Sequence, residues 1–155
     1  MAAGTLAMWQ KLSTLPLGKR LFSVAVMARA PYFATVLPVV ESVEPGRAVV
    51  HAPKWWGVHN HIGTFHAIAA CNLAEVTMGM VAEATVPPTH RWIPKGMTVS
   101  YVAKAKTRLR AVAELPAIPE FGAAPVDVDV PVSIQDKGGT EVVHAVITIK
   151  VSPKR

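Results

Sequence analysis

The segment HNHIGTFHAIAACNLAEVTMGMVAE, residues 59–83, decides the fold. From Phe65 to Glu83 it is apolar on almost every side, and Gly79 alone among these residues is a poor helix former. Thr64 is a suitable N-cap directly before this stretch. A helix that is apolar all round is buried rather than laid on a surface. We therefore expect a buried helix that starts at Thr64 and runs to Glu83.

The sequence on either side of this helix predicts about six strands. Before it, a strand over 33–43, interrupted by Pro38, is joined by a turn at 44–47 to a second strand over 47–52. After it, extended patterns recur in four stretches: 90–104, 109–115, 126–130 with a boundary left open at Pro131, and 142–151. This order predicts the α+β class, with an antiparallel sheet wrapped around one long central helix.

Residues 1–30 form a separate N-terminal helical segment in this interpretation. Apolar side chains recur at helical spacing, which predicts an amphipathic helix that Pro31 ends: Leu17, Leu21, Val24, Ala25 and Ala28. A secretory signal is disfavoured because the apolar run is short, eighteen residues precede Lys19, and Arg29 lies inside the cleavage motif. We expect one domain over 1–155, located in the cytoplasm.

Composition excludes several classes of protein. The net charge of +6 comes from the chain ends: four bases and no acid lie in 1–30, Lys154 and Arg155 follow at the end, and ten bases balance ten acids between them. A neutral body does not favour nucleic-acid binding. Cys71 is the single cysteine, so there is no intramolecular disulfide or cysteine zinc cluster. No uninterrupted apolar stretch approaches the roughly 18 residues of a membrane span.

Glu75 is the candidate for chemistry, because it falls midway along the buried helix. Burial disfavours an ionised carboxylate unless a partner holds it. Such a group can act as a general base or a nucleophile. Asn72 lies one helical turn before it. The alternative is that Glu75 pairs with an arginine or lysine and only fixes the helix in place.

The start of the helix is a second candidate, since its free N–H groups and positive dipole end suit a polarised carbonyl. A glycine-flanked loop over 57–63, which carries Asn60, precedes it. Four histidines crowd into 51–66, but those in the loop lack any recognised ligand spacing with an acidic partner, so we expect no metal. The bases alternating over 104–110 form either a phosphate-binding edge or a solvated strand face. Trp55, Trp56 and Trp92 cover a pocket or pack in the core or in a dimer contact.

The sequence resembles the hotdog-fold family, in particular the PaaI-type acyl-CoA thioesterases and, more closely, a less characterised sister family of that fold. The resemblance rests on the run Asn60–Thr64 followed by Ala74-Glu75, and also on 30–33 and Pro45-Gly46. It implies a hotdog core over 31–155 that forms homodimers, with a dimer of dimers left open, and a site between the subunits.

The resemblance also implies roles for individual residues. Glu75 would be the base or nucleophile on the thioester, and Asn60 would orient substrate or water. The substrate-binding residues would come from the helix start and from the third strand of the partner chain: Gly63, Thr64, His66, the N–H of Ala67, Lys95 and Thr98. The substrate would be a fatty or aromatic acyl thioester of coenzyme A or of a carrier protein. No cofactor is implied beyond the coenzyme A of the substrate.

This sequence departs from the thioesterase pattern in three places. Ala67-Ile68 stand where those enzymes have Gly-Gly, Glu75 replaces the more frequent Asp, and Pro94-Lys95 replace a small hydroxyl residue. A protein that binds acyl chains without hydrolysing them therefore stays open, and an ion pair between Glu75 and Lys95 would favour it. A hotdog dehydratase would need a different pairing of acid and histidine, and a nucleic-acid regulator would need an added recognition helix.

Overall fold

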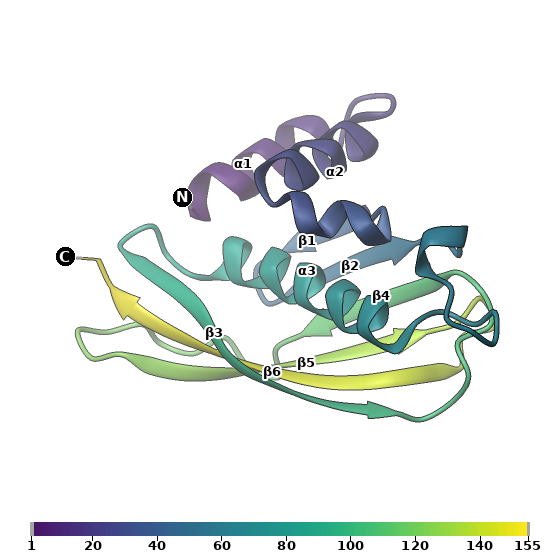
Figure 1. Ribbon diagram of the computed structural model, residues 1–155. Coiled ribbons are helices and arrows are strands. Elements are labelled where there is room, and N and C mark those ends of the chain that lie inside the picture. Colours follow the sequence, from purple (N-terminus) through teal and green to yellow (C-terminus); the bar gives the residue numbers. More distant parts are fainter. Residues whose placement is uncertain (1, 155) are drawn as a thin grey trace.

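The computed structural model describes residues 2–154 and shows one curved antiparallel sheet around a central helix (Figure 1). The helix is α3, Ala67–Thr85. The sheet has the strand order β1-β2-β4-β5-β6-β3. Its strands are β1 Val39–Glu44, β2 Arg47–Ala52, β3 His90–Tyr101, β4 Leu109–Glu114, β5 Val126–Gln135 and β6 Glu141–Pro153. The predicted α+β architecture is confirmed.

The central helix is buried as expected. Leu73, Val76 and Met78 are fully buried, and α3 itself lies between the concave face of the sheet and the N-terminal helices (Figure 1). By length and composition α3 also meets the criterion for a membrane span, and in residues 2–154 it is the one helix that does. Its apolar residues belong to the core of the domain, since 61% of the most apolar 18-residue stretch is buried inside it. This burial identifies α3 as the core helix around which the sheet curves.

Two helices and a 3-10 turn cover α3 on the side away from the sheet (Figure 1). They are α1 Ala2–Leu12, α2 Gly18–Arg29 and η1 Pro31–Val36. The N-terminal helical segment is thus confirmed for α2, while α1 is an additional helix. Gly18 permits their junction, because a Cβ built there would lie 1.7 Å from the carbonyl oxygen of Leu12. The N-terminal layer therefore closes over the middle of α3.

The prediction of which face of α2 packs on the core is wrong. Leu17, Leu21 and Val24 are more than half exposed, whereas Phe22 and Val26 are buried. The cause is that α2 is apolar on two faces, so periodicity alone cannot choose between them. Trp9 of α1 determines which face packs inward, because its ring packs edge-on against Phe22 with centroids 5.1 Å apart.

Several boundaries also differ from the sequence expectation. Residues 31–36 form the 3-10 turn η1, so the first strand begins only at Val39. The strand β3 ends at Tyr101, and the bases at 104, 106 and 108 lie outside any strand, which removes the predicted basic edge. Pro131 lies inside β5, opposite Val146, without ending the strand. Thr64 is not the N-cap of α3, since His66 holds that position.

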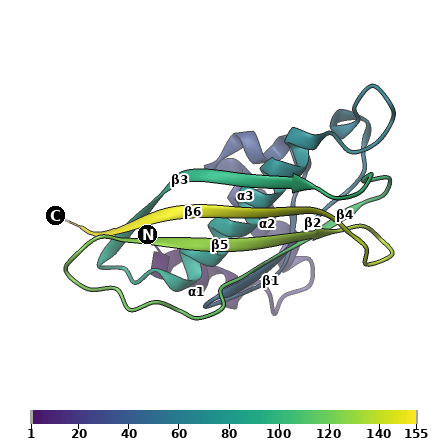
Figure 2. The ribbon, with the colours of Figure 1, turned by 90° about the horizontal axis from the view of Figure 1, so that it is seen from below.

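The edge strand β3 is long and exposed. It pairs with β6 on one side and ends the sheet on the other (Figure 2). Its apolar side chains Ile93, Met97 and Tyr101 are 62%, 37% and 53% exposed. A long apolar edge with unpaired backbone groups is a template for pairing with another strand. The β3 edge is therefore available for pairing with a strand of another chain.

Candidate functional site

Glu75 lies at the junction of two cavities. Its side chain projects from α3, is half-buried, and has no hydrogen-bond or ion-pair partner among residues 2–154. It lines an inner cavity of about 240 Å³ and also a groove of about 290 Å³ along β3, which we call the β3 groove. An unpaired carboxylate placed between two cavities is free to act on a ligand that spans both.

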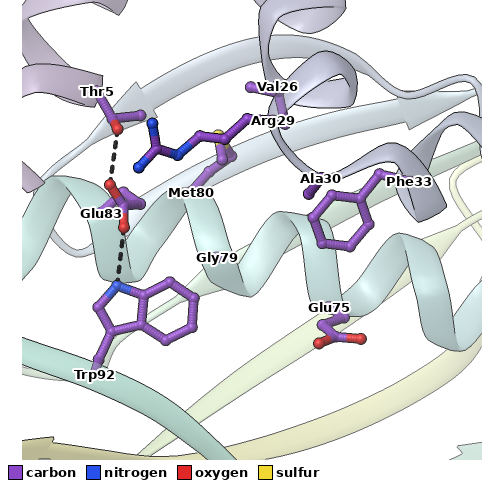
Figure 3. A pocket seen from close by; sticks show the side chains of 10 residues that line it. All are labelled: Thr5, Val26, Arg29, Ala30, Phe33, Glu75, Gly79, Met80, Glu83 and Trp92. Carbon is purple, nitrogen blue, oxygen red and sulfur yellow. Dashed lines mark hydrogen bonds between the residues drawn. The ribbon is translucent and has the colours of Figure 1, made fainter. Parts of the chain in front are cut away.

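The inner cavity lies between α3, the N-terminal helices and β3 (Figure 3). Its walls are mainly apolar, with Val26, Ala30 and Phe33 on one side and Gly79 and Met80 on the helix. Gly79 has no side chain, so the surface of α3 at this position does not project into the cavity. A Cβ built there would have Trp92 as its nearest neighbour. A cavity of this shape suits an alkyl or aromatic group.

The β3 groove contains one of the predicted substrate-binding residues. Lys95 lines it together with Pro94, Gly96 and Met97. The ammonium of Lys95 pairs with the carboxylate of Asp127 at 2.5 Å. Thr98 is exposed on β3 opposite Val146 but does not line the groove. Within one chain, then, Lys95 is held by Asp127, and the ion pair with Glu75 that would favour a binding protein is not formed.

The start of α3 presents the predicted donor. His66 caps the helix, with its Nδ1 accepting from the N–H of Ile68 at 3.1 Å. Ala67 follows as the first helical residue, and an N–H at that position has no acceptor inside its own helix. A carbonyl oxygen can therefore take this hydrogen bond.

The loop before α3 is closed by Asn60. Its Oδ1 accepts from the N–H groups of Ile62 and Thr64 at 3.1 and 3.0 Å, and its Nδ2 donates to the hydroxyl of Thr64 at 2.8 Å. Gly63 is in the left-handed region with φ +73°, which favours glycine. Asn60, Gly63 and Thr64 thus fix the approach to the helix start, and one N–H of the Asn60 amide remains for another partner.

A further cavity of about 220 Å³ lies beside the helix start, and we call it the helix-start cavity. His59 and His66 line it, as does Asn72. Asn72 points toward η1 and not toward Glu75: its Nδ2 donates to the hydroxyl of Thr35 at 2.8 Å. Its Oδ1 is buried without a partner in the part of the chain that the structure describes.

The predicted site residues do not converge within one chain. The Ala67 N–H and Glu75 are eight residues apart on α3, which separates them by ~12 Å along the helix axis. Asn60, Thr64 and His66 lie at the helix start, whereas Glu75 and Lys95 lie at the β3 groove. The site is therefore divided between two places in a single copy.

The histidines do not form a metal site in the described range 2–154, where no three His, Cys, Asp or Glu side chains gather. His51 pairs instead with Glu41, which also accepts from Arg110 at 3.3 Å. Partial burial would raise the pKa of Glu41, but the hydrogen bonds from His51 and Arg110 outweigh it and hold that pKa below its ordinary value. This cluster joins β1, β2 and β4.

Sequence reasoning missed the far end of the inner cavity. Glu83 lies there with Thr5, Arg29 and Trp92, and it accepts hydrogen bonds from the Thr5 hydroxyl at 2.7 Å and the Trp92 ring N–H at 3.1 Å (Figure 3). The sequence feature that could have indicated Glu83 is its position eight residues after Glu75, on the same face of the helix. Thr5 gave none, because it belongs to the helix that was not predicted.

Solved structures similar to this chain share its fold. A structural genomics protein, APC5556, is 39% identical over 97% of this chain and 98% of its own, with a TM-score of 0.83. PA5026 from Pseudomonas aeruginosa, described as a probable thioesterase, is 22% identical over 90% of this chain and 97% of its own, with a TM-score of 0.78. The thioesterase SAV0944 from Staphylococcus aureus is 18% identical over 79% and 99%, with a TM-score of 0.69.

These likenesses confirm the hotdog fold. No curated protein matches the chain in sequence. The model of a domain of unknown function, DUF4442, matches residues 18–151, which include the central helix, β1 to β5 and all but the last two residues of β6, but not α1. The chain therefore belongs to the DUF4442 family and has the hotdog fold.

Proposed function

We propose that this protein hydrolyses acyl-CoA thioesters, with Glu75 as the catalytic carboxylate. The observation that carries the proposal is the position of Glu75, which has no hydrogen-bond or ion-pair partner among residues 2–154 and lies between an apolar cavity and an open groove. The acyl group would occupy the inner cavity, and the thioester carbonyl would lie beside Glu75. Coenzyme A would leave through the β3 groove.

The reaction needs one proton acceptor and one carbonyl-polarising donor. Glu75 takes a proton from a water molecule, the water oxygen attacks the thioester carbon, and the C–S bond breaks. The thiolate of coenzyme A recovers the proton, so the products are the free acid and the thiol. The other route open to this residue is direct attack by the carboxylate on the same carbon, which expels the coenzyme A thiolate and leaves an anhydride that water then hydrolyses to the free acid. A positioned base contributes about 10²–10⁴-fold in rate.

The polarising donor would come from a second copy of the chain. The N–H of Ala67 is too far from Glu75 on its own helix to reach the same carbonyl. Pairing of two β3 edges would bring two α3 helices side by side and set the helix start of one against Glu75 of the other. In that homodimer, Asn60 and His66 accompany the donor, and Lys95 and Thr98 lie at the shared edge.

The similar structures support hydrolysis of a thioester by their descriptions alone. One is described as a probable thioesterase and another as a thioesterase enzyme. Both are under 25% identical to this chain, so they support the proposal through the fold and not through matched residues. The position of Glu75 between the two cavities is the support for hydrolysis that comes from this chain's own structure.

The test is turnover of a panel of acyl-CoA thioesters, measured by release of the free thiol. We expect hydrolysis by the native chain and a loss of about 10²–10⁴-fold in kcat for Glu75→Gln. Glu120→Gln, in the exposed loop before β5, is the matched control and keeps full activity. Full activity in Glu75→Gln would remove this residue from the mechanism. Tight acyl-CoA binding without turnover in the native chain would establish the non-catalytic alternative.

A further inference from the structure

The far end of the inner cavity is polar rather than apolar, because the carboxylate of Glu83 lies there beside the guanidinium of Arg29 (Figure 3). Glu75 and Glu83 lie on the same side of α3, eight residues and ~12 Å apart along the helix axis, and both line this cavity (Figure 3). The wall between them is apolar, with Phe33, Gly79 and Met80. A ligand that starts at Glu75 and follows the cavity therefore meets an ionisable group at its far end.

Glu83 is fixed in place by two other elements of the fold. Thr5 of α1 donates to its Oε2, and Trp92 of β3 donates to its Oε1. An ionised carboxylate has about four lone-pair sites for hydrogen bonds, and these two contacts occupy one site on each oxygen. Each oxygen thus keeps capacity to accept from a ligand. The Glu83 side chain is half-buried, so water molecules can donate fewer hydrogen bonds to its free lone pairs than they could at the surface.

The chemistry of this end selects against a plain alkyl terminus. A methyl group placed against Glu83 would displace water from the carboxylate and give no hydrogen bond in return. A hydroxyl group in the same place would donate to a free lone pair of Glu83. Sites built to bind a substrate hydroxyl discriminate strongly against the analogue that lacks it, because their polar groups are then left unpaired.

We propose that the inner cavity receives an acyl chain of medium length that carries a hydroxyl group at its far end, and that Glu83 accepts the hydrogen bond from this hydroxyl. Glu75 and Glu83 are ~12 Å apart along the helix axis, and an extended chain of that length has on the order of ten carbons. This inference rests on the proposed function, because it takes the thioester to lie beside Glu75. It makes Glu83 the residue that determines specificity for the acyl group.

A purely structural role for Glu83 makes a different prediction. If it only ties α1 and β3 to α3, its replacement lowers stability and affects all substrates alike. A specificity role changes the ratio between two substrates that differ only in the terminal hydroxyl. That ratio is therefore the measurement to make.

The experiment compares ω-hydroxydecanoyl-CoA with decanoyl-CoA on the full chain. We expect kcat/KM of the native protein to favour the hydroxylated substrate by at least about tenfold. Glu83→Leu should bring the ratio to one or below, through loss of turnover of the hydroxylated substrate. Thr5→Val is the matched control: it removes one of the ties but leaves the carboxylate, so the ratio should persist even where the melting temperature falls.

The outcomes separate the two proposals. Equal kcat/KM for both substrates in the native protein, with activity still dependent on Glu75, would overturn the role of Glu83 and leave the hydrolase intact. Absence of turnover for any thioester would overturn the hydrolase. The non-hydrolysable thioethers of the same two acyl groups would then be compared by calorimetry. Binding at least tenfold tighter for the hydroxylated one would support the role of Glu83, and equal binding would overturn it.

Discussion

Ala67 and Glu75 lie on one helix, eight residues and ~12 Å apart along its axis. Reacting atoms in a productive complex are about 3–3.5 Å apart, so these two groups of the same copy cannot act on one carbonyl. If both take part in catalysis, they must come from different copies of the chain. The first three predictions follow from this separation.

Ala67→Pro removes the proposed donor with little change elsewhere. Proline is favoured at the first position of a helix, where its missing N–H has no intrahelical acceptor. His66 already has the extended backbone, φ −65° and ψ 137°, that a residue before proline prefers. We expect kcat to fall about 10²–10³-fold, the cost of one oxyanion donor, at an unchanged melting temperature. Unchanged kcat in this variant would exclude the Ala67 N–H as the donor.

Mixed dimers test whether the site is shared between copies. Glu75→Gln and Ala67→Pro should each be inactive alone. A dimer of one chain of each kind would contain one intact site, formed by Glu75 of the proline variant and the Ala67 N–H of the other chain. We therefore expect partial recovery of acyl-CoA hydrolysis when the two are unfolded and refolded together. No recovery, with mixed dimers shown by mass spectrometry, would contradict the shared site.

Ile93→Glu tests the exposed edge strand as the dimer contact. Ile93 is 62% exposed in one copy, so its replacement should change the stability of a single folded chain by no more than about 0.5 kcal/mol. Two charges facing each other across paired edges would disfavour association. We expect light scattering to show dimers for the native chain and a shift toward monomers for the variant, with loss of activity. Dimers of unchanged stability would place the contact elsewhere.

How far the sequence predicts the fold differs from element to element. The helix over 67–85 and the strand over 47–52 follow from patterns that have one interpretation, since the helix is apolar all round and the strand is bounded by a turn and Pro53. The packing of α2 did not follow, because two of its faces are apolar and Trp9, from a helix that was not predicted, decides between them.

The candidate site was predictable in part. Glu75 stands out because a carboxylate in an apolar helix is unusual, and the structure places it at the junction of two cavities. The division of the site was implied by the family resemblance alone, since sequence spacing does not show that the helix start and Glu75 line different cavities. Glu83 was missed because tertiary packing brings its two partners to it, Thr5 from α1 before the helix and Trp92 from β3 after it.

Gly79 sets the width of the inner cavity. A Cβ at this position would lie 3.7 Å from the Trp92 ring, which is an ordinary contact, so the fold has room for a Cβ here. Gly79→Ala should raise stability by up to about 1 kcal/mol through helix propensity. Gly79→Val should narrow the passage between Glu75 and Glu83. We expect the valine variant to lose turnover of decanoyl-CoA while it keeps that of butanoyl-CoA; equal effects on both would show that acyl chains take another path.

Glu41 should make stability depend on pH at the acidic end. Its pKa is held below the ordinary 4.5 because hydrogen bonds from His51 and Arg110 outweigh the effect of burial. A carboxyl group with a lowered folded-state pKa stabilises the protein above its ordinary pKa, and this contribution disappears as the pH falls through the folded-state value. Because Glu41 and its partners are more than a third exposed, the contribution is under about 1 kcal/mol.

Glu41→Gln removes this contribution at every pH. The melting temperature of the native chain should therefore exceed that of the variant at pH 7, and the gap should close as the pH is lowered below about 4, near the ordinary pKa of a glutamate. Arg110→Gln, which leaves the His51 contact in place, should give a smaller gap at pH 7. A gap that stays constant from neutral to acidic pH would show that Glu41 acts through packing of β1 on β2 and not through its charge.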